Sequence, residues 1–136
     1  MSRKIAITYS AILGTQAGLG RNASGQVLIA DRPSGMAGGT GLGFNGAELL
    51  AASLGGCFWN DLHYAAAQMG ATITVETVET RIDLAGEPPR IVRAHVAARI
   101  TGNADAAQRV FEAARADSTI ASSLRAAFPI VIERLS

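Results

Sequence analysis

The chain has 136 residues, of which 49% are hydrophobic and 17% charged, and its formal net charge is +1. This length suits a single domain over residues 1–136, and so small a charge excludes a surface that holds nucleic acid non-specifically. The single cysteine excludes an internal disulfide and a multi-cysteine metal site. No apolar run reaches the ~18 residues of a membrane span, and no signal peptide is recognisable, so we expect a soluble, cytoplasmic protein.

The N-terminal third is predicted to contain two strands and a long loop. Alternating apolar residues predict a strand over residues 3–12, and a short apolar run predicts another over Gln26–Ala30. Three glycines between them are expected to break the chain: Gly14, Gly18 and Gly20. Residues 31–46 are dense in glycine and irregular, and a loop of this length inside a compact domain is more often functional than idle.

A long helix is predicted from Gly46 to Met69. Asn45 is a favourable N-cap, Glu48 stands where a capping box needs its acidic partner, and Gly70 is a typical C-cap. One stripe of side chains follows helical spacing: Leu50, Leu54, Cys57, Asp61 and Tyr64. The remaining circumference is also largely apolar, so we expect the helix to be central.

The paired glycines Gly55 and Gly56 interrupt this helix. Each costs about 1 kcal/mol in a helix interior, so we expect a close approach by another backbone or helix to compensate.

The C-terminal half is predicted to be a β-hairpin, two helices and a last strand. The hairpin pattern slips by one residue after Val75. The predicted boundaries are Thr72–Leu84 and Arg90–Thr101 for the hairpin, Asp105–Ala116 and Thr119–Ala127 for the helices, and Pro129–Leu135 for the strand. This order is not a regular alternation of strands and helices, and it predicts the α+β class.

Two literal motif matches predict no cofactor and no metal. Gly41-Leu-Gly-Phe-Asn-Gly46 has the spacing of a dinucleotide fingerprint, but no apolar strand precedes it, as that fingerprint requires. We interpret its glycines as part of a flexible loop that leads into the long helix and allows close packing. Neither His63 nor His95 has a second ligand one turn away. Only Cys57 and Asp61 are one helical turn apart, as two metal ligands on one helix would be, and this spacing is weak evidence for a metal site.

Cys57 is the residue best suited to chemistry, although a lone cysteine on an apolar helix is often only a small hydrophobe. Asp61, one turn later, disfavours the thiolate. A reactive thiol therefore needs a cation from outside the helix, and Arg21 and Arg32 are the upstream candidates with loop-like freedom.

The run Gly38-Gly-Thr-Gly-Leu-Gly-Phe-Asn-Gly-Ala-Glu-Leu-Leu-Ala-Ala-Ser-Leu-Gly-Gly-Cys57 resembles the signature of the OsmC/Ohr superfamily, the osmotically inducible protein C and organic hydroperoxide resistance proteins. The resemblance extends over the whole chain. It implies an OsmC-like fold in which a long central helix packs against antiparallel sheets, within an intertwined homodimer. It also implies that Cys57 is the family's first active cysteine and lies at the subunit interface.

Several positions depart from the pattern that this resemblance implies. Ser118 stands where the peroxidase branch has its resolving cysteine, and a serine cannot form a disulfide. The family's Asn-Pro-Glu becomes Asn45-Gly46-Ala47, which leaves Glu48 as the nearest acid. The family's catalytic arginine falls near Gln16, and only a gap brings Arg21 into register.

Two functions remain open. The first is a single-cysteine thiol peroxidase that acts on organic hydroperoxides, with Cys57, Arg21 and Glu48 as catalytic residues and an external thiol or dithiol as reductant. The second is a non-catalytic dimer that binds a small apolar molecule at the subunit interface, next to Leu50, Leu54 and Asp61.

Overall fold

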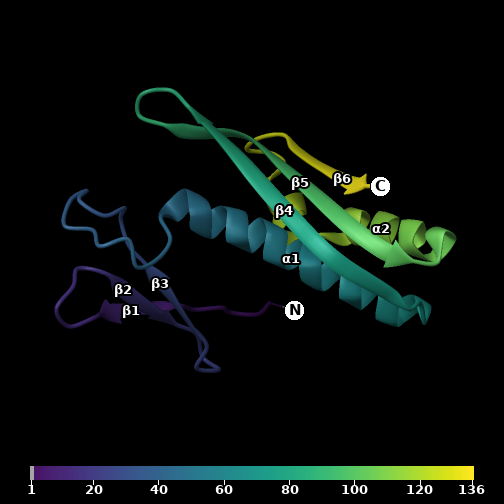
Figure 1. Ribbon diagram of the computed structural model, residues 1–136, viewed down its shortest axis with the longest axis horizontal. Coiled ribbons are helices and arrows are strands. Elements are labelled where there is room, and N and C mark those ends of the chain that lie inside the picture. Colours follow the sequence, from purple (N-terminus) through teal and green to yellow (C-terminus); the bar gives the residue numbers. More distant parts are fainter. Residues whose placement is uncertain (1) are drawn as a thin grey trace. The chain divides into compact units, whose positions relative to one another are not determined.

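The computed structural model describes residues 2–136 and has the α+β class expected from the sequence (Figure 1). It forms two compact units, of which the first ends at Leu49 and the second spans Leu50–Ser136. Each unit contains a three-stranded sheet. Within the described residues, no helix combines the length and the apolar character that crossing a membrane requires.

The sheet of the first unit is an antiparallel meander. Its strands are β1 (Thr8–Ala11), β2 (Gly18–Arg21) and β3 (Val27–Ala30), in that order. The predicted strand over residues 3–12 is therefore longer than the observed one.

The expected chain break at Gly18 and Gly20 is wrong, because both glycines belong to β2. Tyr9 pairs with Gly20 across the sheet, and a Cβ atom on Gly20 would stand 2.9 Å from the Tyr9 ring. The glycines leave room for this ring to lie over the strand, an arrangement that offsets the weak strand propensity of glycine.

The glycine-rich loop over residues 31–46 is closely packed, as its composition predicts. Gly35, Gly38 and Gly41 have positive φ angles of +84°, +77° and +68°, which side chains rarely adopt. A Cβ on Gly39 would stand 2.5 Å from the Arg32 carbonyl oxygen, and one on Gly43 would overlap the Ile29 carbonyl. The loop thus needs glycine both for its turns and for backbone contacts.

Helix α1 (Gly46–Met69) has the predicted boundaries. The Asn45 N–H donates to Glu48 Oε1 at 2.9 Å, and the Glu48 N–H donates to Asn45 Oδ1 at 2.8 Å, which completes the predicted capping box. At the other end, Gly70 has a φ of +61° and the Ala71 N–H donates to the Ala66 carbonyl at 2.9 Å. This C-terminal cap is also as predicted.

The sheet of the second unit has the order β4-β5-β6 (Figure 1). The elements of this unit that follow α1 are β4 (Ile73–Ala85), β5 (Arg90–Gly102), α2 (Ala104–Asp117), α3 (Thr119–Leu124) and β6 (Ile130–Leu135). The antiparallel pair β4–β5 shifts register between Val75 and Thr77, at the predicted slip.

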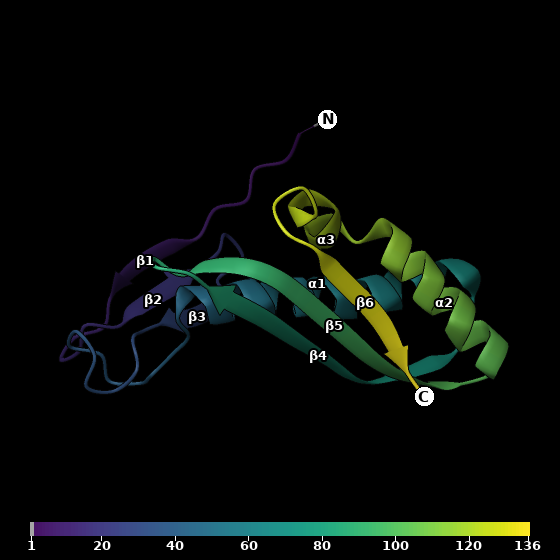
Figure 2. The same ribbon diagram turned by 90° about the horizontal axis from the view of Figure 1, so that it is seen from above.

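Strand β6 pairs with β5 in parallel, so this sheet is mixed rather than antiparallel throughout. Parallel neighbours need a crossover connection, and α2 and α3 supply it (Figure 2).

Helices α1 and α2 pack on one face of this sheet, where the core of the second unit lies. The rings of Phe58 on α1 and Phe111 on α2 meet edge to face with centroids 5.8 Å apart. The strands contribute alternating apolar residues, and the fully buried set includes Leu54, Phe58, Leu62, Val96, Ala98, Val110 and Ala121.

The buried face of α1 is rotated from the predicted stripe. Phe58 and Leu62 are completely buried, whereas Tyr64 is 69% exposed and Cys57 is half-buried at the edge. The reason is Gly55, whose missing side chain allows α1 to approach Thr80 of β4. The atoms nearest to Gly55 are side-chain atoms of Thr80 and Val78 in β4, and not the backbone or helix that the sequence led us to expect. Gly56 faces open space in this chain.

Candidate functional site

Cys57 lies between two polar side chains of the second unit. Its thiol donates to Asp61 Oδ2 at 3.5 Å, one turn further along α1. Its sulfur accepts from Ser118 Oγ at 3.9 Å. The sulfur therefore has one acceptor and one donor beside it, from segments 61 residues apart in sequence.

Ser118 connects α2 to α3 and is only 1% exposed. As the N-cap residue of α3, it is placed to cap that helix, but its side chain makes no capping hydrogen bond. The hydroxyl is directed to Cys57 instead. The serine that the resemblance aligns with a resolving cysteine is thus in contact with the candidate nucleophile.

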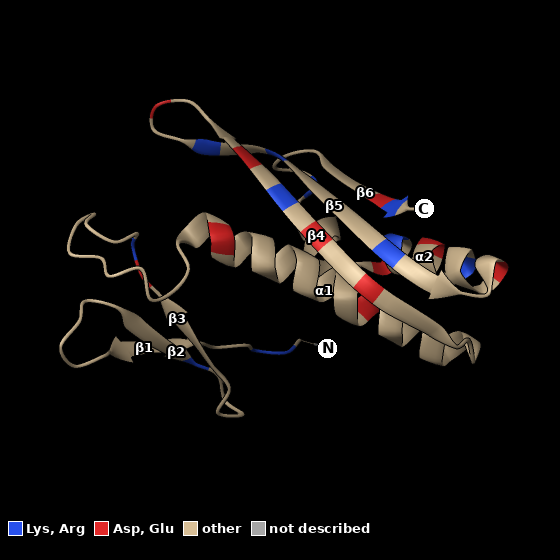
Figure 3. Cartoon of the chain, in the orientation of Figure 1, with Lys and Arg blue, Asp and Glu red and all other residues tan. Residues whose placement is uncertain are grey.

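Asp61 borders a small cavity of about 160 Å³ between α1 and α2. The other lining residues are Tyr64, Ala65, Gln68, Ala113, Ala114 and Asp117. Figure 3 shows how few charges α1 carries, and Glu48 and Asp61 are its only two charged residues. A carboxylate next to the thiol is consequently an exception on this helix.

The two leucines expected to contact a ligand belong mainly to the core. Leu54 is 1% exposed, and Leu50 is partly buried against the core cluster. Only Leu50 keeps surface that a second molecule can reach in this chain.

The other expected catalytic residues lie in the first unit. Arg21 is exposed at the end of β2. The carboxylate of Glu48 accepts the Asn45 N–H in the capping box. Arg32 is held within its own unit, since its Nη2 donates to the Gln16 carbonyl at 2.6 Å and lies 3.4 Å from Asp31 Oδ1. None of these three residues belongs to the unit that contains Cys57.

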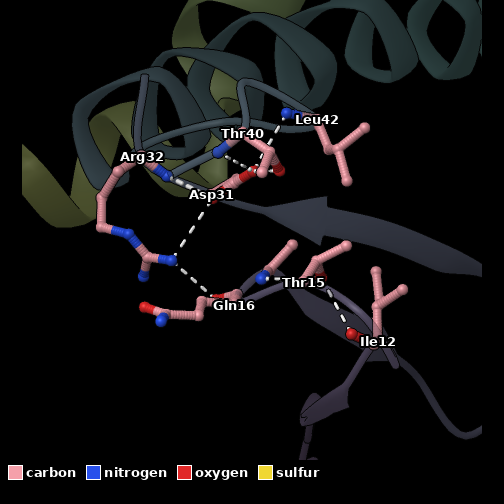
Figure 4. Close-up of polar contacts among 8 residues, drawn as sticks. Ile12, Thr15, Gln16, Asp31, Arg32, Thr40 and Leu42 are labelled. Carbon is pink, nitrogen blue, oxygen red and sulfur yellow. Dashed lines mark hydrogen bonds and ion pairs between the residues drawn. The ribbon is translucent and has the colours of Figure 1, made fainter. Parts of the chain in front are cut away.

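Asp31 is a central residue of the first unit that the sequence did not reveal. Its carboxylate accepts the Leu42 N–H at 3.0 Å, the Thr40 hydroxyl at 2.8 Å and the Arg32 N–H at 2.8 Å (Figure 4). These bonds, that from Leu42 first, lower its pKa from 3.8 to about 2 although burial opposes the shift. The one available signal was an acidic residue directly after a strand and before a loop of turn-forming residues.

Metal ligands are not gathered anywhere in residues 2–136, where no three His, Cys, Asp or Glu side chains come together. The groups around Cys57 that can take part in chemistry are its thiol, the Asp61 carboxylate and the Ser118 hydroxyl. Asp61 can take the proton of the Cys57 thiol, and the Ser118 hydroxyl can donate to an anionic sulfur or to an oxygen bound to it.

Comparison with known proteins places these observations in a family context. The family model described as OsmC-like protein matches residues 39–133. No curated protein matches the chain.

Solved structures of the same fold cover nearly the whole chain. A Psychrobacter arcticus protein assigned to osmotic stress induction and detoxification response is 23% identical, covers 99% of this chain and 97% of its own, and has a TM-score of 0.77. The organic hydroperoxide resistance protein OsmC of Legionella pneumophila is 18% identical, covers 98% of both chains and has a TM-score of 0.72. OhrB of Bacillus subtilis, another organic hydroperoxide resistance protein, is 21% identical with 98% of both chains covered and a TM-score of 0.67. At these identities the likeness shows the fold alone.

Proposed function

The chain belongs to the OsmC-like protein family, and from this premise we propose that it reduces organic hydroperoxides with Cys57 as the nucleophile. The observation that carries the proposal is the pair of contacts at the sulfur, where Asp61 accepts and Ser118 donates. Two solved relatives of the same fold are organic hydroperoxide resistance proteins, which supports this class of substrate.

The proposed first step forms a sulfenic acid. The Cys57 sulfur attacks the terminal oxygen of the hydroperoxide, the O–O bond breaks, and the thiol is oxidised while the peroxide is reduced to an alcohol. Asp61 takes the thiol proton and returns it to the departing alkoxide, so that Cys–SH and ROOH give Cys–SOH and ROH. The Ser118 hydroxyl stabilises the negative charge that develops at the sulfur.

The proposed second step requires a reductant from solution. Ser118 has no sulfur with which to form a disulfide, and Cys57 is the only cysteine of the chain. An external thiol therefore condenses with the sulfenic acid and releases water, and a second thiol reduces the mixed disulfide. A dithiol carrier accomplishes both reactions.

Arg21 and Glu48 have roles in this proposal that depend on assembly. Both belong to the first unit, and in the proposed homodimer Arg21 supplies the cation that favours the thiolate, from the same or the partner chain. Glu48 is proposed to orient this arginine in addition to capping α1.

The proposal is tested by the rate at which Cys57 forms sulfenic acid with cumene hydroperoxide, tert-butyl hydroperoxide and hydrogen peroxide. Because the chain has one cysteine, a dimedone adduct detected by mass spectrometry reports on this residue alone. We expect the organic hydroperoxides to react faster than hydrogen peroxide and much faster than they do with free cysteine. The Cys57→Ser variant provides the blank.

The second candidate function is non-catalytic binding of a small apolar molecule, for which Leu50, partly buried against the core cluster, keeps surface that a ligand can reach. The same measurement separates the two functions. Sulfenic acid formation no faster than that of free cysteine contradicts the peroxidase and leaves the binding function.

A further inference from the structure

The mixed sheet of the second unit has an open edge at β6. This strand is the last in the order β4-β5-β6, so one of its sides pairs with β5 and the other has no neighbouring strand within residues 2–136 (Figure 1). The Ala94 N–H donates to the Pro129 carbonyl at 3.0 Å, and Ala94 stands opposite Ile130. Because the backbone groups of successive strand residues point to alternate sides, those of Ile130 and Ile132 point away from β5. The edge therefore offers N–H donors and C=O acceptors at the spacing of an extended chain.

A cavity of about 510 Å³ lies beside this edge, within the second unit. Its lining includes three residues of β6, two of α2 and the residue that follows α3: Ile130, Val131, Ile132, Glu112, Arg115 and Arg125. Val131 is 55% exposed. The helices that pack on the sheet thus leave room along the edge of β6 for a further chain.

The charges around this cavity favour a negatively charged partner. Glu112 already has partners, since it accepts from Arg115 Nη2 at 2.6 Å and from Gln108 Nε2 at 2.9 Å. Arg125 is exposed and forms no ion pair within residues 2–136. Its guanidinium, with five N–H donors, is the uncompensated cation of the cavity.

A second cation without a carboxylate partner is located near the other end of β6. Arg134 Nη1 donates to Gln108 Oε1 at 3.1 Å, and its Nη2 donates to the Ile100 carbonyl at 3.3 Å, so both acceptors are neutral. The acidic residue of β6, Glu133, lies 2.9 Å from His95 Nε2 on the neighbouring strand. The open edge is therefore flanked by positive charge at both ends.

We propose that the edge of β6 binds an extended acidic segment of another protein, which adds to the sheet as a further strand. The segment pairs with the backbone of Ile130 and Ile132, and its carboxylates accept hydrogen bonds from Arg125. A second copy of this chain fits less well, because antiparallel pairing of two β6 edges brings the Arg134 end of each copy to the Arg125 end of the other. Cys57 takes no part, so the proposal is independent of the proposed function.

The test is binding of a fluorescein-labelled peptide of about six alternating glutamate and valine residues with blocked ends, a length that matches an ordinary strand. Fluorescence anisotropy at low salt measures its affinity. A peptide with lysine in place of glutamate controls for charge, and we expect it to bind at least about tenfold more weakly. Equal binding of the lysine peptide, or no saturable binding of the acidic peptide, overturns the proposal.

Two N-methylated peptides separate strand pairing from ionic attraction alone. One carries the methyl groups on its valines and the other on its glutamates, so both keep the negative charges but lose alternate N–H donors. Only alternate residues of an added strand face β6, so we expect one of the two peptides to bind at least about tenfold more weakly than the parent. Binding of both at the parent's affinity contradicts an added strand.

Variants of the chain locate the site. Arg125→Gln should weaken binding of the acidic peptide at least about threefold, and Arg125→Glu should weaken it further while improving binding of the lysine peptide. Arg109→Gln is the matched control, since it removes the same charge from an exposed position of α2 outside the cavity, and it is expected to leave the affinity unchanged. Equal losses in Arg125→Gln and Arg109→Gln overturn the assignment of the site.

Two further measurements keep the test decisive. Circular dichroism checks the fold of each variant, and the N-methylated peptides on the parent chain decide if an Arg125 variant fails to fold. Light scattering with and without peptide tests the second copy as occupant. Assemblies larger than a dimer that the acidic peptide dissociates would show that β6 edges pair with each other, which contradicts the proposal.

Discussion

At the scale of single residues, the carboxylate of Asp61 and the hydroxyl of Ser118 have opposite expected effects on Cys57. A carboxylate 3.5 Å from the sulfur repels negative charge there, so Asp61→Asn should accelerate alkylation by iodoacetamide at neutral pH, but it should slow the reaction with hydroperoxides, in which Asp61 passes the thiol proton to the alkoxide. For alkylation we expect an increase of about three- to tenfold, since a partly exposed charge at this distance contributes on the order of 1 kcal/mol. The rate is measured by mass spectrometry of the single cysteine.

A matched control separates a local effect from a change in net charge. Asp117→Asn removes the same charge from the far side of the cavity and is expected to leave the alkylation rate nearly unchanged. Ser118→Ala removes the donor to the sulfur and should slow alkylation, whereas an unchanged rate would show that the hydroxyl does not stabilise the anion.

Asp31 predicts a pH dependence for the first unit. Its pKa is about 2 in the folded chain against an ordinary 3.8, so its ionisation favours folding above pH 3.8. This contribution is lost as the pH falls from 3.8 to about 2. We expect Asp31→Asn to be less stable than the parent chain at pH 6 in urea unfolding followed by circular dichroism. The difference should shrink below pH 4, and a difference independent of pH would contradict the assigned role.

At the scale of secondary-structure elements, the two glycines of α1 are expected to respond differently to alanine. A Cβ on Gly55 overlaps the Thr80 hydroxyl, so Gly55→Ala should destabilise by about 1–3 kcal/mol, the usual cost of overpacking. Thr80→Ala in the same chain should recover most of that loss in urea unfolding. Recovery by less than half would indicate that the helix itself, rather than this contact, requires glycine.

Gly56→Ala is the matched substitution one position later. Nothing stands within 4 Å of its added Cβ in this chain, so the helix propensity of alanine should stabilise the isolated chain by up to about 1 kcal/mol. A loss of stability instead would indicate that another molecule packs closely on this face of α1.

The elements whose signals are local were predictable from the sequence. The caps of α1 follow from Asn45, Glu48 and Gly70, and the register shift of β4 follows from its slip in alternation after Val75. Strand β2 was not predictable, because glycine has a weak strand propensity. Its glycines are accommodated in the strand because the Tyr9 ring lies over them, and this contact is not visible in the sequence. The parallel pairing of β6 was not predictable either, since the sequence of a short apolar strand does not indicate whether the neighbouring strand runs parallel or antiparallel to it.

The residues of the candidate site also differ in whether the sequence could predict them. Cys57 and Asp61 are neighbours by helical spacing and were predicted as a pair. Ser118 approaches them through the packing of α2 on α1, and only the family resemblance pointed to it. Asp31 depends on donors nine and eleven residues away in a loop without periodicity.

At the scale of the whole molecule, the exposed face of α1 predicts self-association. Trp59 is 38% exposed and Tyr64 is 69% exposed on a helix that bears only two charged residues. We expect an obligate homodimer whose interface exceeds the ~2,000 Å² at which obligate interfaces begin. Light scattering at micromolar concentration should give twice the chain mass, and a natively folded monomer by circular dichroism would contradict this prediction.

The glycine-rich loop also has a consequence for how this chain tolerates changes in length. Surface loops ordinarily accept inserted residues, because few of their backbone groups are committed to partners. Here Asp31 binds the amides of Thr40 and Leu42, the Phe44 amide donates to Ile29, and Gly39 and Gly43 lie against neighbouring backbone. One residue added or removed between these anchors displaces all of them together. This segment therefore has a fixed length, and it is a poor place for an epitope tag or a circular-permutation break.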